Sequence, residues 1–173
     1  MDVVLRLPAL SEEPEFLRAH RATSPTAPHF LHGYQPGMSL QRYLEVLAER
    51  ERGENLPASQ VPATFLFAFA GPAIVGRVSI RHALSSYFER VGGHIGYVVV
   101  PEYRRQGYAT AILRQALQIA RVKLGLTRVL VTCDDDNIGS IKTIENNRGV
   151  LESIVSGPES DKPKRRYWIA TPD

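Results

Sequence analysis

Residues 94–110 read HIGYVVVPEYRRQGYAT, and this stretch decides the fold. Its first seven residues are rich in β-branched side chains, which favour a β-strand. A turn follows at Pro101, Glu102 and Tyr103, and residues 110–117 then have the composition of a helix. This order predicts a strand that runs through a tight turn into the N-terminus of a helix.

That turn has the features of a phosphate-binding site. The first N–H groups of a helix have no partner within the helix, and the helix dipole is positive there. Gly107 and Ala109 have almost no side chain, so a ligand can approach the backbone closely. Arg104 and Arg105 add positive charge. Together these residues predict a pyrophosphate-binding turn, and the simpler alternative is a glycine-bearing turn with solvated arginines.

Helices and strands alternate on both sides of this unit. Ser11 and Ser39 are expected to cap helices, and Gly125 is expected to end the helix that begins at the turn. The order of elements predicts a mixed α/β fold, with a mostly antiparallel sheet of about seven strands flanked by about four helices. Strands are expected at residues 3–7, 63–69, 74–81, 94–100, 128–133, 150–155 and 166–170, and helices from residue 11 and over residues 40–50, 110–124 and 137–147, with a final hairpin around Gly157 and Pro158.

Length and composition predict one globular domain over residues 1–173. Cys133 is the only cysteine, so the chain can form no internal disulfide and we expect a cytoplasmic location. The N-terminus lacks a signal-peptide pattern, and no apolar run approaches the roughly 20 residues of a membrane span. The net charge of +3 does not indicate nucleic-acid binding. The basic residues at 162–166 are expected to form a solvated hairpin tip.

The pattern Arg104-x-x-Gly107-x-Ala109 resembles the acyl-coenzyme A signature of the GNAT superfamily of N-acetyltransferases. Residues 93–110 are similar to its bacterial predicted-acetyltransferase branch, and the resemblance extends from about residue 74 to about residue 150. It implies acetyl-coenzyme A (acetyl-CoA) as the cofactor and transfer of the acetyl group to a primary amine. A non-catalytic acyl-CoA-binding module of the same fold is the alternative.

The resemblance also implies where the coenzyme binds. The pantetheine arm would pair with the backbones of Val98 and Val100, beside a neighbouring strand that has moved away. A second family motif matches Asn137 and Ser140, and Asn137 is also a plausible helix cap. Many members have a tyrosine in this motif that protonates the leaving thiolate, but this chain has Ile144 there. The pyrophosphate would lie on the turn residues Arg104, Arg105, Gln106, Gly107, Tyr108, Ala109 and Thr110.

His94 is the candidate catalytic residue. A lysine-like amine has a pKa of about 10.4 and is protonated at neutral pH, so a base must remove its proton. The family often places a glutamate on the fourth strand, and His94 is the aligned residue. Imidazole, with a pKa of about 6.5, suits this task. The alternative is a hydrogen-bonded histidine at the strand end that moves no proton, and Glu102 is a weaker candidate base.

The acceptor is expected to bind between the loops at residues 23–37 and 85–92. These two loops are long enough to cover the acetyl end of the coenzyme, and aromatic faces favour an apolar or cationic acceptor. The expected partner is a small-molecule or peptide amine, with no nucleic acid and no membrane. The alternative is that these rings pack in the core or in a homodimer interface. The substrate-binding candidates are His29, Tyr34, Tyr87 and Phe88, with Phe30 and His32 beside them.

Three further chemistries are weaker. Cys133 ends a strand near the expected thioester, but a free cysteine is more often a core residue than a covalent acyl carrier. The acids at residues 134–136 lack the spacing of a calcium loop, so we expect no metal. The chain has no Gly-x-x-x-x-Gly-Lys-Ser/Thr loop, which argues against a phosphotransferase.

Overall fold

The structure is a computed structural model that describes residues 2–156 and 162–172. Within these residues the elements follow the predicted order, with one further short helix, α3. The strands are β1 (Val4–Arg6), β2 (Ala63–Ala70), β3 (Ala73–Arg81), β4 (Ile95–Val99), β5 (Arg128–Asp134), β6 (Val150–Ser156) and β7 (Pro163–Ala170). The helices are α1 (Glu13–Thr23), α2 (Leu40–Arg52), α3 (Ser86–Arg90), α4 (Tyr108–Leu124) and α5 (Ile138–Glu145), with 3-10 turns η1 (Leu10–Glu12) and η2 (Pro101–Tyr103).

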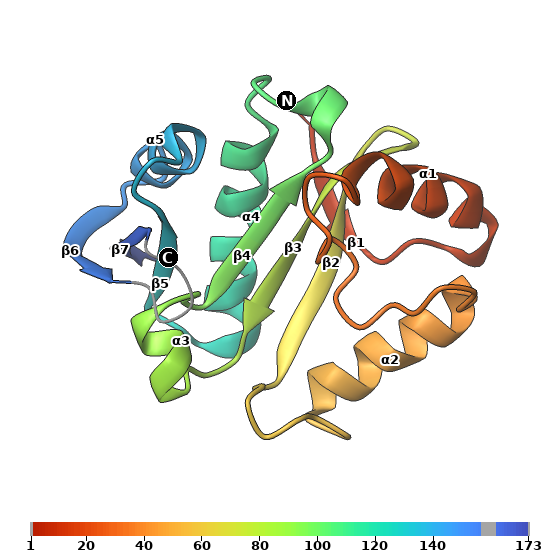
Figure 1. Cartoon of the computed structure of the whole chain (residues 1–173), viewed down its shortest axis with the longest axis horizontal. Helices are drawn as coiled ribbons and strands as arrows, with labels where there is room; N and C mark the ends of the chain where they lie inside the picture. Colours follow the sequence, from red (N-terminus) through yellow and green to blue (C-terminus); the bar gives the residue numbers. More distant parts are fainter. Residues whose placement is uncertain (1, 157–161, 173) are drawn as a thin grey trace.

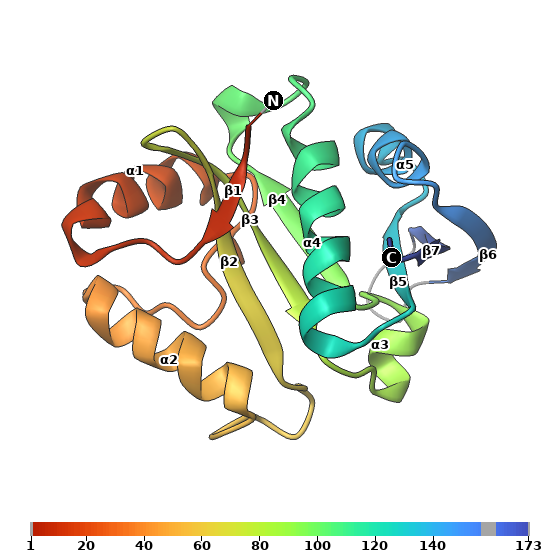
Figure 2. The same cartoon turned by 180° about the vertical axis from the view of Figure 1, so that it is seen from behind.

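The seven strands form two antiparallel sheets. The first has the order β1-β2-β3-β4 and the second has the order β5-β7-β6. Helices α1 and α2 cover one face of the first sheet, and α4 covers the other face (Figures 1 and 2). Aromatic rings such as Phe16 and Phe67 fill the core under α1 and α2. The core under α4 contains Val75 from the first sheet and Val129 from the second, so α4 packs on both.

The two sheets meet at the start of β4. The N–H of His94 donates to the carbonyl of Leu130 (2.7 Å), and the N–H of Leu130 donates to Nδ1 of His94 (2.9 Å). Gly93 permits this approach, because its φ is +60° and a Cβ there would lie 2.4 Å from the carbonyl oxygen of Leu130. Beyond this sheet junction β4 and β5 diverge toward the N-terminal end of α4 (Figure 1).

The structure corrects three details of the sequence prediction. Ser11 is not a helix cap, because the carboxylate of Glu12 accepts the N–H of Ala9 instead (2.8 Å). The loop expected at residues 85–92 contains α3, capped by Ser85. The expected turn at Gly157 and Pro158 lies outside the described residues.

The third correction concerns the basic residues near the C-terminus. Lys164 and Arg165 belong to β7 and pair in register with Asp134 and Cys133 of β5. Lys164 forms an ion pair with Asp134, and Arg165 forms one with Asp135 (2.6 Å). These cations therefore stabilise the second sheet and are not a solvated hairpin tip.

Among the residues that the structure describes, no helix combines the length and the apolar character needed to cross a bilayer.

Candidate functional site

The turn before α4 offers unused backbone donors. Gly107 is the N-cap residue with φ +87°, and no side chain caps the helix. Arg105 also has a positive φ, of +63°. Among the described residues, no acceptor is found for the N–H groups of residues 105–110, whereas the N–H of Ala111 donates to Gly107. A row of free N–H groups at a helix N-terminus fits the pyrophosphate of a coenzyme.

Side chains of the same turn hold its shape. Arg104 donates to the carbonyl of Val99 (3.1 Å) and to the hydroxyl of Thr26 (2.8 Å). Gln106 donates to the carbonyl of Glu102 (3.0 Å). These contacts fix the turn against the end of β4, and the coenzyme contacts of the turn residues remain predictions.

The backbone of β4 corrects the expectation for Val98 and Val100. The N–H of Val100 donates to the carbonyl of Val75 in β3 (2.9 Å). Antiparallel pairing alternates along a strand, so Val98 also directs its backbone groups toward β3. Tyr97 and Val99 alternate with these residues, so their backbone N–H and carbonyl groups point away from β3, toward the side on which β5 diverges. The open backbone edge of β4 therefore consists of the backbone groups of Tyr97 and the N–H of Val99, whose carbonyl accepts from Arg104.

Tyr97 is a candidate that the sequence prediction missed. Its hydroxyl is buried and has no hydrogen-bond partner among the described residues. Burial raises the pKa of Tyr97 to about 12, and its environment includes Ser140, Thr143 and Cys133. Ile144, at the family's tyrosine position, is fully buried in the core. An unpartnered buried hydroxyl is costly unless a ligand supplies its partner.

Asn137 caps α5, as one of its two predicted roles required. Its side-chain oxygen accepts the N–H of Ser140 (3.0 Å). Asn137 is exposed and Ser140 is half-buried, on the side of the second sheet that faces α4. Contact of either residue with the coenzyme remains a prediction.

The geometry of His94 opposes its predicted role as a base. A neutral imidazole has one donor nitrogen and one acceptor nitrogen. Because Nδ1 of His94 accepts the N–H of Leu130, the proton lies on Nε2 and no free lone pair remains. Burial, and then the charge of Arg81, lower the pKa of His94 below its usual value. The base role remains a prediction, and the structure gives this side chain a clear structural one.

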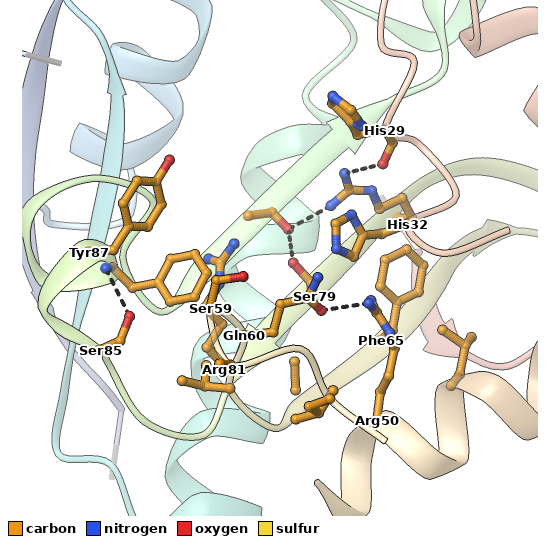
Figure 3. A pocket seen from close by; sticks show the side chains of 18 of the residues that line it. His29, His32, Arg50, Ser59, Gln60, Phe65, Ser79, Arg81, Ser85 and Tyr87 are labelled. Carbon is orange, nitrogen blue, oxygen red and sulfur yellow. Dashed lines mark hydrogen bonds between the residues drawn. The ribbon is translucent and has the colours of Figure 1, made fainter. Parts of the chain in front are cut away.

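A cavity of about 840 Å³ lies on the face of β3 and β4 that α2 covers (Figure 3). His29, His32, Tyr87 and Phe88 line it, and their contact with the acceptor remains a prediction. Gly96 of β4 also lines it, so the cavity reaches the strand that diverges from β5.

Two of the predicted aromatic residues do not reach this cavity. The ring of Tyr34 packs against Phe16 (5.7 Å) and Tyr43 (5.5 Å) in the aromatic core. Phe30 is fully buried in the same core. Tyr34 is therefore wrong as a cavity residue, because its ring packs against Phe16 of α1 and Tyr43 of α2 and does not line the cavity.

Three arginines, Arg50, Arg77 and Arg81, line this cavity, which we call the arginine pocket. The guanidinium of Arg77 donates to the carbonyls of Phe30 (3.1 Å), His29 (3.1 Å) and Gly96 (3.4 Å). Burial lowers the pKa of Arg77 to about 10, so it stays protonated at neutral pH. The sequence contained a signal for this, because Arg77 and Arg81 alternate with apolar residues and share one face of β3.

The remaining reactive groups near β5 are engaged or unreactive. Asp134 and Asp135 pair with β7, and Asp136 pairs with Lys162 (2.7 Å). Within the described part of the chain, no group of three or more candidate ligands could hold a metal ion. Burial raises the pKa of Cys133 to about 11, so its thiol stays protonated at neutral pH, and a covalent acyl-cysteine route is disfavoured.

The chain is similar to a known family of proteins. The model of the acetyltransferase (GNAT) family matches residues 28–150. No curated protein matches the chain. Solved structures of similar fold include the microcin self-immunity acetyltransferase MccE with acetyl-CoA and AMP, at 16% identity and a TM-score of 0.70, over 98% of this chain and 92% of that one.

Two further structures have the same architecture. RimL, a ribosomal-protein alpha-N-acetyltransferase in complex with coenzyme A, has 17% identity and a TM-score of 0.68, over 97% of this chain and 93% of its own. A spermidine N-acetyltransferase chimera of SpeG from Vibrio cholerae and hSSAT has 16% identity and a TM-score of 0.66, over 99% and 96%. At these identities the likeness concerns the fold.

Proposed function

The chain belongs to the acetyltransferase (GNAT) family, and from that premise we propose that it transfers acetyl from acetyl-CoA to an amine held in the arginine pocket. One observation carries this proposal. The open edge of β4 leads from the unused amides at the start of α4 to the arginine pocket, so that both substrates can meet beside Gly96 and Tyr97.

The residues present fit acetyl-CoA, which supplies an activated acetyl thioester. The N–H groups of residues 105–110 would bind the pyrophosphate at the positive end of the α4 dipole. The backbones of Tyr97 and Val99 would pair with the pantetheine amides. Asn137 and Ser140 lie across the divergence and would bind the same arm.

Transfer forms a bond between the amine nitrogen and the acetyl carbon and breaks the carbon–sulfur bond. The amine loses one proton, and the leaving sulfur needs one. We assign the sulfur's proton donor to Tyr97, whose buried hydroxyl has no hydrogen-bond partner in the part of the chain that the structure describes and lies near Ser140. Its raised pKa keeps the hydroxyl protonated until the sulfur becomes negative.

The pocket itself would help to remove the proton of the amine. Positive charge nearby disfavours the ammonium form, so Arg77 and Arg81 would lower the pKa of a bound amine. A larger fraction of the acceptor is then neutral and nucleophilic without a strong base. The predicted base role of His94 is an alternative that its contact with Leu130 opposes.

A coupled measurement tests this function. Thiol release from acetyl-CoA is followed with a panel of amines, and calorimetry measures acetyl-CoA binding separately. We expect micromolar-scale binding and amine-dependent thiol release. Binding without release for any amine would favour the non-catalytic acyl-CoA module, and absence of binding would overturn the proposal.

Three further expectations belong to this proposal. The single cysteine suits a cytoplasmic setting, where disulfides are rare. The core shared by both sheets under α4 supports a single domain over residues 1–173. A homodimer remains a prediction.

A further inference from the structure

The arginine pocket carries positive charge that no acidic side chain balances. Arg50, Arg77 and Arg81 line it, and within the described chain no aspartate or glutamate does. The pKa of His32, which also lines the pocket, is lowered by burial and then by the charges of Arg50 and Arg77, with Arg81 among the weaker causes. All three guanidinium groups are therefore close enough to affect the same side chain. The charges therefore converge on one space.

Six arginines outside the pocket form ion pairs with carboxylates in the described part of the chain. None of the three pocket arginines has an ion pair among the described residues, although acids are about as numerous as bases in the sequence. Burying an unpaired charge is costly, so an unbalanced cluster indicates a missing anionic partner. The paired arginines are Arg6 with Glu12, Arg18 with Glu15, Arg42 with Glu45, Arg52 with Glu54, Arg165 with Asp135 and Arg166 with Glu152.

The two arginines of β3 are held in place with donors to spare. A guanidinium has five N–H groups. Arg77 uses three of them on the carbonyls of His29, Phe30 and Gly96. Arg81 bonds the carbonyls of Gly92 and Gly93 through Nη1 and lies over the ring of Phe88, 4.0 Å from its centroid. Such a fixed fork with free donors suits bidentate binding of a carboxylate or phosphate.

We propose that the acceptor is an amine that also carries an anionic group, a carboxylate or a phosphate, which binds Arg77 and Arg81. This inference rests on the proposed acetyl transfer and adds the chemical class of its acceptor. Positively charged acceptors such as polyamines are repelled by the same pocket.

The position of Arg77 limits the distance between the two groups of the acceptor. Its Nη1 lies 3.4 Å from the carbonyl oxygen of Gly96, on the strand beside which the thioester would lie. The anionic group therefore binds close to the transfer site, and the amine must be only a few bonds away. Amino acids and small amino phosphates have this arrangement.

Matched acceptor pairs test the charge requirement. Phenylalanine is compared with phenylalanine amide, and O-phosphoethanolamine with ethanolamine, with spermidine as the cationic member. We expect the anionic member of at least one pair to have the higher kcat/KM by roughly tenfold or more, the size of a charge-assisted hydrogen bond. The pair that responds distinguishes a carboxylate from a phosphate acceptor.

A variant links the effect to the pocket. Arg81→Met should raise KM for the anionic acceptor by roughly ten- to a hundredfold and leave KM for acetyl-CoA unchanged. Arg114→Met, at an exposed arginine of α4, is the matched control and should change neither constant. If Arg81→Met does not fold, Arg81→Lys serves in its place, because it keeps the positive charge but loses the planar fork that binds a carboxylate or phosphate through two hydrogen bonds, and KM for the anionic acceptor should again rise.

The outcomes separate this inference from the proposed function. Acetyl-CoA binding with preferential acetylation of neutral or cationic amines would overturn the anionic acceptor alone, as would an Arg81→Met effect on KM for acetyl-CoA only. If no amine in the panel reacts, calorimetry with the anionic acceptors on protein saturated with coenzyme A decides, and absence of binding overturns the inference. Absence of acetyl-CoA binding itself would overturn the proposed function.

Discussion

Tyr97 carries a buried hydroxyl with no hydrogen-bond partner within the described residues, which makes it the most informative single residue to change. Tyr97→Phe should lower kcat by roughly tenfold to a hundredfold, because the leaving sulfur loses its proton donor. KM for acetyl-CoA should stay the same. Stability should not fall, since removing an unpartnered polar atom is neutral or favourable. Steady-state kinetics and thermal unfolding measure both effects.

Tyr167→Phe is the matched control for this change. Tyr167 of β7 is also buried, but its hydroxyl donates to the carboxylate of Glu145 in α5 (3.2 Å). This variant should lose some stability and keep its kcat. An unchanged kcat in Tyr97→Phe would mean that the hydroxyl takes no part in transfer.

His94 gives a prediction about pH. Its pKa is lowered in the folded chain by burial and by Arg81, whereas the unfolded chain titrates near 6.5. Its contribution to stability is therefore complete above about pH 6.5 and is lost as the pH falls from there toward the folded pKa, because the unfolded chain binds the proton first. His94→Asn cannot titrate but can still accept the N–H of Leu130, so it should lose less stability in acid.

Urea unfolding of wild type and His94→Asn at about pH 5 and about pH 8 measures this difference. His20, His32 and His82 also have lowered pKa values, but they are present in both proteins and cancel in the comparison. The acidic limb of the kcat profile should persist in the variant. Its disappearance would instead support His94 as the base.

Some residues of the candidate site could be predicted from the sequence and others could not. The turn at Gly107 was predictable, because a glycine between a strand and a helix indicates a tight turn of the backbone. The role of Tyr97 was not predictable, since a tyrosine is common in a strand and only the structure shows that its buried hydroxyl has no hydrogen-bond partner among the described residues. Arg77 and Arg81 share a strand face by simple alternation, but the absence of an acid opposite them depends on α2 and its following loop.

At the level of elements, the N-terminus of α4 gives a comparison of two glycines. Gly107 and Gly125 bound the same helix, both with positive φ, +87° and +65°. A side chain at either position costs about 1–2 kcal/mol in strain. Gly107→Glu should in addition abolish acetyl-CoA binding, because it places negative charge beside the pyrophosphate, whereas Gly125→Glu should bind normally. Calorimetry decides, and equal affinity in the two variants would remove the pyrophosphate site from this helix end.

Elements with local signals were predicted well. Ser39 caps α2 and Gly125 ends α4, as expected from their residue types. β7 was predicted to begin at residue 166 but begins at Pro163, because its basic residues are paired with acids about 30 positions away, Asp134 at the end of β5 and Asp135 just after it. Such long-range pairing leaves no local pattern in the sequence.

At the scale of the whole molecule, the shared core predicts cooperative unfolding. Trp168 lies in β7 and is the only tryptophan, so its fluorescence reports on the second sheet. Far-UV circular dichroism reports mainly on the helices, most of which pack on the first sheet. We expect the two urea transitions to coincide, because α4 packs on both sheets. Two separated transitions would show that the sheets unfold as independent units.

The order of elements was predictable from the sequence, and the family resemblance implied that a neighbour of the fourth strand has moved away. The single sheet of about seven strands that we expected is divided into sheets of four and three strands, because β4 and β5 share backbone hydrogen bonding only at His94 and Leu130 in the described part of the chain. Nothing in the sequence of either strand forbids further pairing. In Figure 2, α4 lies between β4 and β5 and α5 lies beside β5, and both helices contribute residues to the core that the two sheets share.

The sheet junction at Gly93 and His94 has a consequence for handling the protein. Past that point β4 and β5 each keep an unpaired edge, and unpaired edges promote aggregation by strand addition. A coenzyme arm bound along β4 would cover that edge and block access to it. Protein purified without coenzyme A should therefore precipitate sooner on warming than protein stored with it.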